Sequence, residues 1–120
     1  MARSEDGRLP NARRAVVDRE KVVSYLLNPV HPDNGGKAAF FEALGFTGFD
    51  WQGFADAMRR VAVVGSVTEE VESVHGTKYV VDGKIEGPGG RAAGVRTIWI
   101  TDAGSETPRL VTAYPHRGDG

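Results

Sequence analysis

The spacing of hydrophobic residues changes near Gly65, and this change constrains the fold more than any other feature of the chain. Before Gly65, apolar residues recur every three or four positions, as in "WQGFADAMRRVAVV", a spacing typical of helices. After it, apolar and polar residues alternate in four segments, as in β-strands: 67–75, 77–87, 92–101 and 108–115. We therefore predict an α+β fold, with N-terminal helices packed on one face of a C-terminal, roughly four-stranded antiparallel sheet.

Three helices are expected before Gly65. Asp18 is placed to accept from the free N–H groups at the start of the first helix. The second covers residues 36–45, with Asp33 or Asn34 as its cap and Gly45 ending it in a left-handed turn. Asp50 caps the third.

The domain limits follow from the same pattern. A chain of 120 residues is long enough for one compact domain, which we place at residues 13–115. Residues 1–12 are polar and are expected to form a flexible lead-in, and residues 116–120, "HRGDG", a disordered tail.

The charge balance argues against a globally basic nucleic-acid-binding protein. Fifteen basic and sixteen acidic residues give a net charge of -1, so any basic site must be local. No apolar run is long enough to span a bilayer, and no signal-peptide pattern is visible at the N-terminus. We expect a cytoplasmic protein, or a module of a larger one, without a membrane partner.

Several classes of site are disfavoured by the motifs. Cysteine is absent, which excludes a thiol nucleophile. The three histidines do not follow the ligand spacing of a zinc site, and neither a phosphate-binding P-loop nor a dinucleotide fingerprint is present. We predict no metal and no cofactor.

The sheet face that the helices leave uncovered should carry the polar residues of the strands. It would combine an imidazole, three cations and two hydroxyls, from His75, Lys78, Arg96, Arg109, Thr112 and Tyr114. Cleavage of RNA needs a similar set, because the 2'-hydroxyl is the nucleophile, a base and an acid move protons, and cations stabilise the phosphorus centre.

Structural roles for the same residues stay open. Thr and Tyr are frequent in strands, and the arginines are equally explained as solvated surface residues. In a regular strand Arg109 faces away from Thr112 and Tyr114, and a bulge or a strand-end position is needed to bring it round.

The segment "NPVHPDNGGK" offers an accessory phosphate contact. His31 precedes Lys37, which stands in the first turn of the second helix, where backbone N–H groups favour anions. A plain turn in which His31 packs the loop explains the segment as well.

The motifs "LPNARRAVVDREKVVSYLLNPVHPDNGGKAAFFEALGF", "HGTKYVV" and "RTIWI…PRLVTAYP" occur in this order and resemble a bacterial domain family of unknown function. The resemblance covers about Leu9 to Pro115, and such domains occur alone or as C-terminal modules of polymorphic toxins. The element order and "TAYP" also look like the superfamily of barnase, EndoU, colicin tRNases and RelE, mostly metal-independent ribonucleases. That resemblance implies a site at His75 or Lys78 and at Thr112 or Tyr114, although His75 stands where the motif would have tyrosine.

We therefore predict a toxin-type, metal-independent ribonuclease with an antitoxin or immunity protein as partner. The expected catalytic residues are His75, Lys78, Thr112 and Tyr114, and the expected RNA-binding residues are Arg96, Arg109, His31 and Lys37. Two alternatives remain open: a non-catalytic protein-binding module of the antitoxin or immunity type, and a nucleotide- or NAD-processing toxin.

Overall fold

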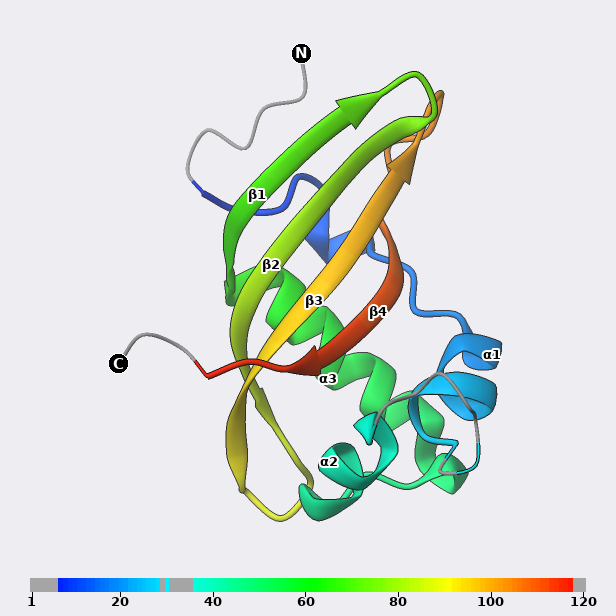
Figure 1. Cartoon of the computed structure of the whole chain (residues 1–120), viewed down its shortest axis with the longest axis vertical. Helices are drawn as coiled ribbons and strands as arrows, with labels where there is room; N and C mark the ends of the chain where they lie inside the picture. The colour runs from blue at the N-terminus through cyan, green and yellow to red at the C-terminus, as the bar shows by residue number, and fades with distance from the viewer. Residues whose placement is uncertain (1–6, 29, 31–35, 118–120) are drawn as a thin grey trace.

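The computed structural model describes residues 7–28, 30 and 36–117 and has the predicted α+β architecture. The helical part contains α1 (Arg19–Lys21), η2 (Val22–Leu26), α2 (Lys37–Ala43) and α3 (Trp51–Val64), with short 3-10 turns η1 (Ala12–Arg14) and η3 (Gly48–Asp50). Four strands follow: β1 (Ser66–Ser73), β2 (Gly76–Glu86), β3 (Ala92–Asp102) and β4 (Arg109–Pro115). They form one antiparallel sheet in the order β1-β2-β3-β4, with α3 packed behind it and the shorter helices beside β4 (Figure 1).

Helix α3 carries much of the core. Asp50 caps it as predicted, because its carboxylate accepts from the Gly53 amide at 3.1 Å. Phe54 is fully buried and meets the rings of Phe41 and Phe46 edge to face, with centroids 4.9 and 5.1 Å apart. These contacts connect α2 and α3 into one apolar layer beneath the sheet.

The other helix ends follow their sequence signals where they are described. Asp18 accepts from the Glu20 amide at the start of α1, and Gly45 adopts the expected left-handed conformation with φ 99° after α2. Gly36 precedes α2 with φ 87°, whereas the expected caps Asp33 and Asn34 lie outside the described residues.

The strand register divides the side chains between two faces. On the core face, Tyr79, Val81, Val95, Trp99 and Leu110 belong to the buried cluster that includes α3. The face opposite α3, called the open face below, carries cross-strand rows in the order β2, β3, β4. The three rows are Lys78–Ile100–Arg109, Val80–Ile98–Thr112 and Asp82–Arg96–Tyr114.

A bulge in β4 decides the direction of Arg109. Thr112 pairs with Ile98 and Leu110 pairs with Trp99, so Val111 is the extra residue between the two pairs. Arg109 then pairs with Ile100, which shares the open face with Ile98. The sequence indicated that Arg109 could share a face with Thr112 if the strand contained a bulge. The structure has this bulge, and Arg109 lies on the same face as Thr112.

The two ends of the described chain lie against the domain. Residues 7–12 belong to the segment expected to be a flexible lead-in, yet Leu9 is buried and the Asn11 side-chain amide donates to the Glu106 carbonyl at 2.8 Å. Past β4, the His116 amide donates to the Gly94 carbonyl, which fixes the first residue of the expected tail. No helix within the described ranges is long and apolar enough to cross a membrane.

Candidate functional site

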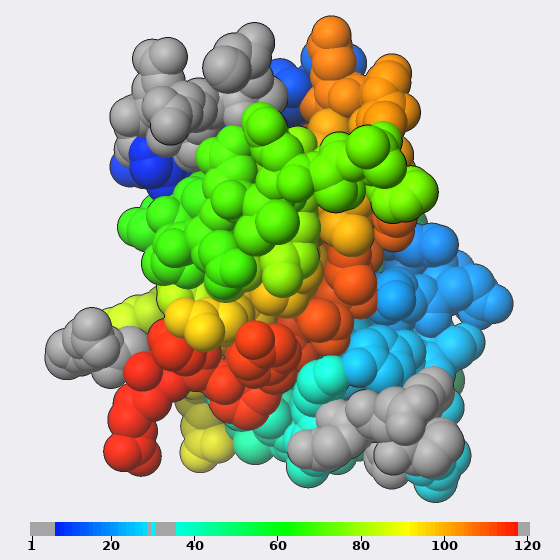
Figure 2. All heavy atoms as spheres, turned by 45° about the horizontal axis from the view of Figure 1, so that its top comes forward, coloured from blue at the N-terminus to red at the C-terminus, as the bar shows by residue number. Residues whose placement is uncertain are grey.

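Lys37 brings the helical part to the open face. Its ammonium donates to the Tyr25 hydroxyl at 2.5 Å and to Thr112 Oγ1 at 3.2 Å, and Nζ lies 4.7 Å from the Tyr25 ring centroid and 6.0 Å from that of Tyr114. One cation is thus surrounded by three hydroxyl-bearing side chains from η2 and β4. We call Tyr25, Lys37, Thr112 and Tyr114 the Lys37 cluster. In Figure 2 the red and orange spheres of β4 lie directly against the cyan helical segment.

The cluster changes the acidity of Tyr25. The hydrogen bond from Lys37 is the largest influence that lowers the pKa of the Tyr25 hydroxyl, and the hydrogen bond with Thr112 adds to it. The charges of Lys37 and of Lys21, whose Nζ lies 5.3 Å from the ring centroid, act in the same direction. Tyr25 is therefore easier to deprotonate than an ordinary tyrosine.

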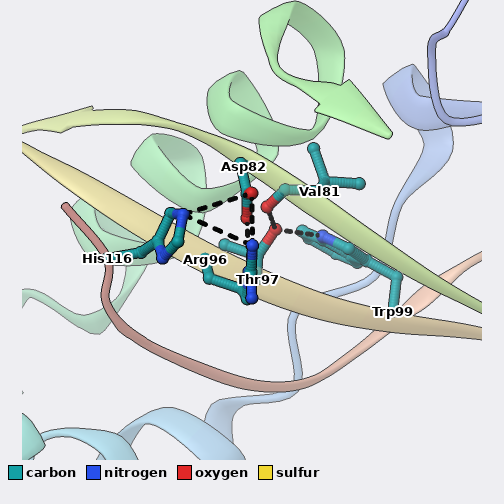
Figure 3. A network of polar contacts seen from close by, with 6 residues as sticks. All are labelled: Val81, Asp82, Arg96, Thr97, Trp99 and His116. Carbon is teal, nitrogen blue, oxygen red and sulfur yellow. Dashed lines mark hydrogen bonds and ion pairs between the residues drawn. The ribbon is translucent and has the colours of Figure 1, made fainter. Parts of the chain in front are cut away.

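A second polar group lies beside the cluster on the same face. Arg96 binds both oxygens of Asp82 at 2.8 Å, and His116 Nε2 lies 3.4 Å from Asp82 Oδ2 and 3.3 Å from Arg96 Nη2 (Figure 3). The hydrogen bond from Arg96 lowers the pKa of Asp82, and His116 and Thr68 act in the same direction. Asp82, Arg96 and His116 form the Asp82 network.

Tyr114 connects the two groups. Its hydroxyl contributes, after the larger effect of Asp82, to raising the pKa of Arg96. The same ring lies beside Lys37 Nζ. A continuous polar band therefore crosses the open face from Asp82 to Tyr25.

The core supports this band from the other side of the sheet. The Trp99 indole N–H donates to Thr97 Oγ1 at 2.7 Å, and that hydroxyl donates to the Val81 carbonyl at 2.8 Å (Figure 3). Thr97 and Trp99 are fully buried. The strands that carry Asp82 and Arg96 are thus held together directly behind the Asp82 network.

His75, Lys78 and Arg109 lie at the opposite end of the open face. They line one shallow depression of about 280 Å³ near the β1–β2 turn. Arg109 is paired there with Asp102, at 2.8 and 3.1 Å, and both side chains are half exposed. We call this group the hairpin end.

The predicted site residues thus separate into two groups. Lys37, Arg96, Thr112 and Tyr114 come together, whereas His75, Lys78 and Arg109 do not join them, and His31 lies outside the described residues. Four residues along a strand separate the row of Lys78 from that of Tyr114, about 13 Å at roughly 3.3 Å per residue. The four residues predicted to be catalytic cannot all surround one phosphate.

Sequence reasoning missed Tyr25, Asp82 and His116. Asp82 alternates with core residues of β2, and this parity alone could have placed it on the open face. Tyr25 lies in a helical segment and His116 in the expected tail, so neither carried a strand signal. In the described part of the chain, no group of three or more His, Cys, Asp or Glu side chains is arranged to hold a metal ion.

Comparison with protein families gives a match over residues 8–117 to a domain of unknown function, DUF6883. The chain belongs to this family. The DUF6883 domain is also similar in structure to a chain of the contact-dependent growth inhibition toxin–immunity protein complex from Klebsiella pneumoniae 342. The TM-score is 0.66 at 17% identity, over 90% of this chain and 98% of that chain. A search of curated proteins found no match.

These findings confirm the family of unknown function that the motifs indicated, and the relation to a toxin–immunity system is one of structural similarity. At 17% identity the similarity shows a shared fold, and activity must be argued from the residues of the DUF6883 domain itself.

Proposed function

We propose that the DUF6883 domain is a toxin-type, metal-independent ribonuclease whose active centre is the Lys37 cluster. The observation that carries the proposal is the position of Lys37 Nζ, within hydrogen-bonding distance of the Tyr25 and Thr112 hydroxyls and beside the Tyr114 ring. A cation among hydroxyl donors on an uncovered sheet face suits a phosphodiester that becomes more negative during cleavage.

The chemistry follows from these groups. The 2'-hydroxyl of RNA attacks the adjacent phosphorus and loses its proton to a base. Tyr25 suits this step because the neighbouring ammonium lowers its pKa. Lys37 and the hydroxyls of Thr112 and Tyr114 stabilise the phosphoryl oxygens, and no step requires a metal.

The partner is part of the same proposal. The similar solved structure comes from a complex of a toxin with its immunity protein. We infer that a cognate immunity protein binds the DUF6883 domain and covers the open face, which would keep RNA from the Lys37 cluster.

Purified protein incubated with total bacterial RNA in EDTA tests the activity. We expect cleavage that leaves 2',3'-cyclic phosphate ends, and growth arrest when the protein is expressed. Lys37→Met should lose both. Intact RNA with the wild-type protein, or cleavage only after a divalent metal is added, would contradict the proposal.

A protein-binding module of the immunity type is the second candidate. Strand β1 favours it, because Glu69 and Glu72 are exposed and Glu70 is half-buried along one edge of the sheet, and these carboxylates would repel RNA phosphates. Harmless expression, together with stable binding to a basic toxin domain, would favour this candidate over the ribonuclease.

A further inference from the structure

His116 is the histidine nearest to the Lys37 cluster in the described chain. It follows Tyr114 by two residues and contacts Arg96, the guanidinium that Tyr114 also approaches. Its amide is fixed by the Gly94 carbonyl, and about a third of its side chain is exposed. The ring is therefore held in place while solvent, or a bound chain, can still reach it.

The two ring nitrogens have different surroundings. Nε2 faces Asp82 and Arg96, whereas no hydrogen bond from residues 7–28, 30 or 36–117 reaches Nδ1. When the ring is protonated, Nε2–H donates to the Asp82 carboxylate, and this contact fixes the orientation of the ring. Nδ1–H is then the proton that a bound molecule can take.

Charged and titratable groups approach His116 from all three neighbouring strands. Asp82 contacts it from β2, Arg96 from β3, and Tyr114 precedes it on β4. Lys84, also on β2, pairs with Gly94, the residue that binds the His116 amide. Of these four residues, Asp82 carries the negative charge, so a protonated His116 can form an ion pair with it.

We propose that His116 is the general acid of the cleavage reaction, and this role rests on the ribonuclease function proposed above. As the 2'-oxygen bonds to phosphorus, the bond from phosphorus to the 5'-oxygen breaks. The Nδ1 proton of His116 passes to that 5'-oxygen, which leaves as a neutral alcohol. His116 ends neutral, and the RNA fragment carries a 2',3'-cyclic phosphate. Tyr25 then releases to solvent the proton that it removed from the 2'-hydroxyl, and His116 takes up a proton from solvent, so that both residues return to their starting forms.

His75, which the sequence favours for proton transfer, provides the matched control. It lies in the depression at the hairpin end, beyond the row of Lys78, and so outside the reach of a phosphate held at Lys37. Replacing each histidine by the same residue removes the same imidazole group from the two ends of the open face, so any difference in activity comes from its position.

The experiment varies the leaving group. Cleavage sites are first mapped in total bacterial RNA with the wild-type protein. Two oligoribonucleotides that copy one mapped site are then made, one with the natural 5'-oxygen and one with sulfur at that bridging position. A thiolate can leave without taking up a proton, since thiols have a pKa of about 8.5.

We expect His116→Ala to slow cleavage of the oxygen substrate by about a hundredfold or more and to cleave the sulfur substrate almost as fast as the wild type. His75→Ala should match the wild type on both substrates. His116→Gln keeps a similar size and polarity, so it gives the same comparison if the alanine variant melts early.

Equal loss on both substrates, or no loss on either, would overturn the role of His116 as the acid. Failure of the wild-type protein to cleave any site in total RNA would instead contradict the ribonuclease proposal itself. The two failures are therefore distinguishable.

Discussion

The two ends of the open face carry similar side chains in different surroundings. At the hairpin end, the cations Lys78 and Arg109 stand on strands, and Arg109 is matched to the half-exposed Asp102. At the other end, Lys37 reaches across from α2 and meets hydroxyls of η2 and β4. The comparison teaches that cations and hydroxyls converge on the open face where the helical part meets β4, because strands alone keep their rows several ångströms apart.

The largest expected effect separates the two lysines. Lys37→Met removes the charge and the two hydrogen bonds of the Lys37 cluster, so cleavage of RNA should fall by about 10²–10³-fold. Lys78→Met removes an exposed charge at the hairpin end and should leave the rate within about threefold of the wild type. Single-turnover rates on total RNA measure both.

Circular dichroism melts provide the control for the lysine pair, since both variants should unfold near the wild-type temperature. If Lys78→Met loses more activity than Lys37→Met while both remain folded, the assignment of the site to the Lys37 cluster is wrong.

The next effect compares the two aspartate–arginine pairs. Asp82 is four-fifths buried by its side chain, so Asp82→Ala leaves Arg96 without its bidentate partner and should lower the free energy of unfolding by about 1–3 kcal/mol. Asp102→Ala removes a half-exposed pair and should shift the urea midpoint much less. Equal shifts of the urea midpoint in the two variants would show that the Asp82–Arg96 pair is no better protected from solvent than the Asp102–Arg109 pair.

Acid unfolding extends this comparison. The pKa of Asp82 and that of Asp102 are both lowered in the folded protein, in each case chiefly by an arginine hydrogen bond. Their stabilisation is therefore fully present above the ordinary value of 3.8 and is lost as the pH falls through the folded value. Asp82→Asn should flatten the stability curve in that range more than Asp102→Asn does.

The smallest effect is spectroscopic. In an ultraviolet titration, Tyr25 should ionise at lower pH than Tyr79, because Lys37 lowers the pKa of Tyr25 whereas burial raises that of Tyr79. Lys37→Met should move the Tyr25 step upward, and Lys78→Met should leave it in place. A titration that the Lys37 substitution does not change would remove the basis for Tyr25 as the base.

Much of the fold was predictable because its signals are local. The period change at Gly65, the cap at Asp50 and the alternation in four segments gave the order and type of the elements. The site was only partly predictable. Thr112, Tyr114 and Arg96 followed from strand parity, but the approach of Lys37 to Thr112 joins residues 75 positions apart, and no local pattern encodes it. The bulge at Val111 likewise became clear only from the pairing with β3.

The sequence alone also did not predict which side chains the charged residues of the open face contact. Arg96 and Arg109 were expected to bind RNA or to be solvated surface residues, yet each forms an ion pair with an aspartate of the sheet. His116 was expected to be the first residue of a disordered tail, whereas its contacts come from β2 and β3. Both outcomes depend on cross-strand register rather than on neighbours along the chain.

Chemical-shift mapping with an uncleavable RNA tests the central claim most directly. An oligoribonucleotide copy of a mapped cleavage site, with a single 2'-deoxy sugar at the scissile position, lacks the nucleophile and should bind without reacting. We predict that its addition shifts the amide signals of Lys37, Thr112 and Tyr114 and leaves those of His75 and Lys78 unchanged. Shifts confined to the hairpin end would contradict the assignment of the functional site to the Lys37 cluster.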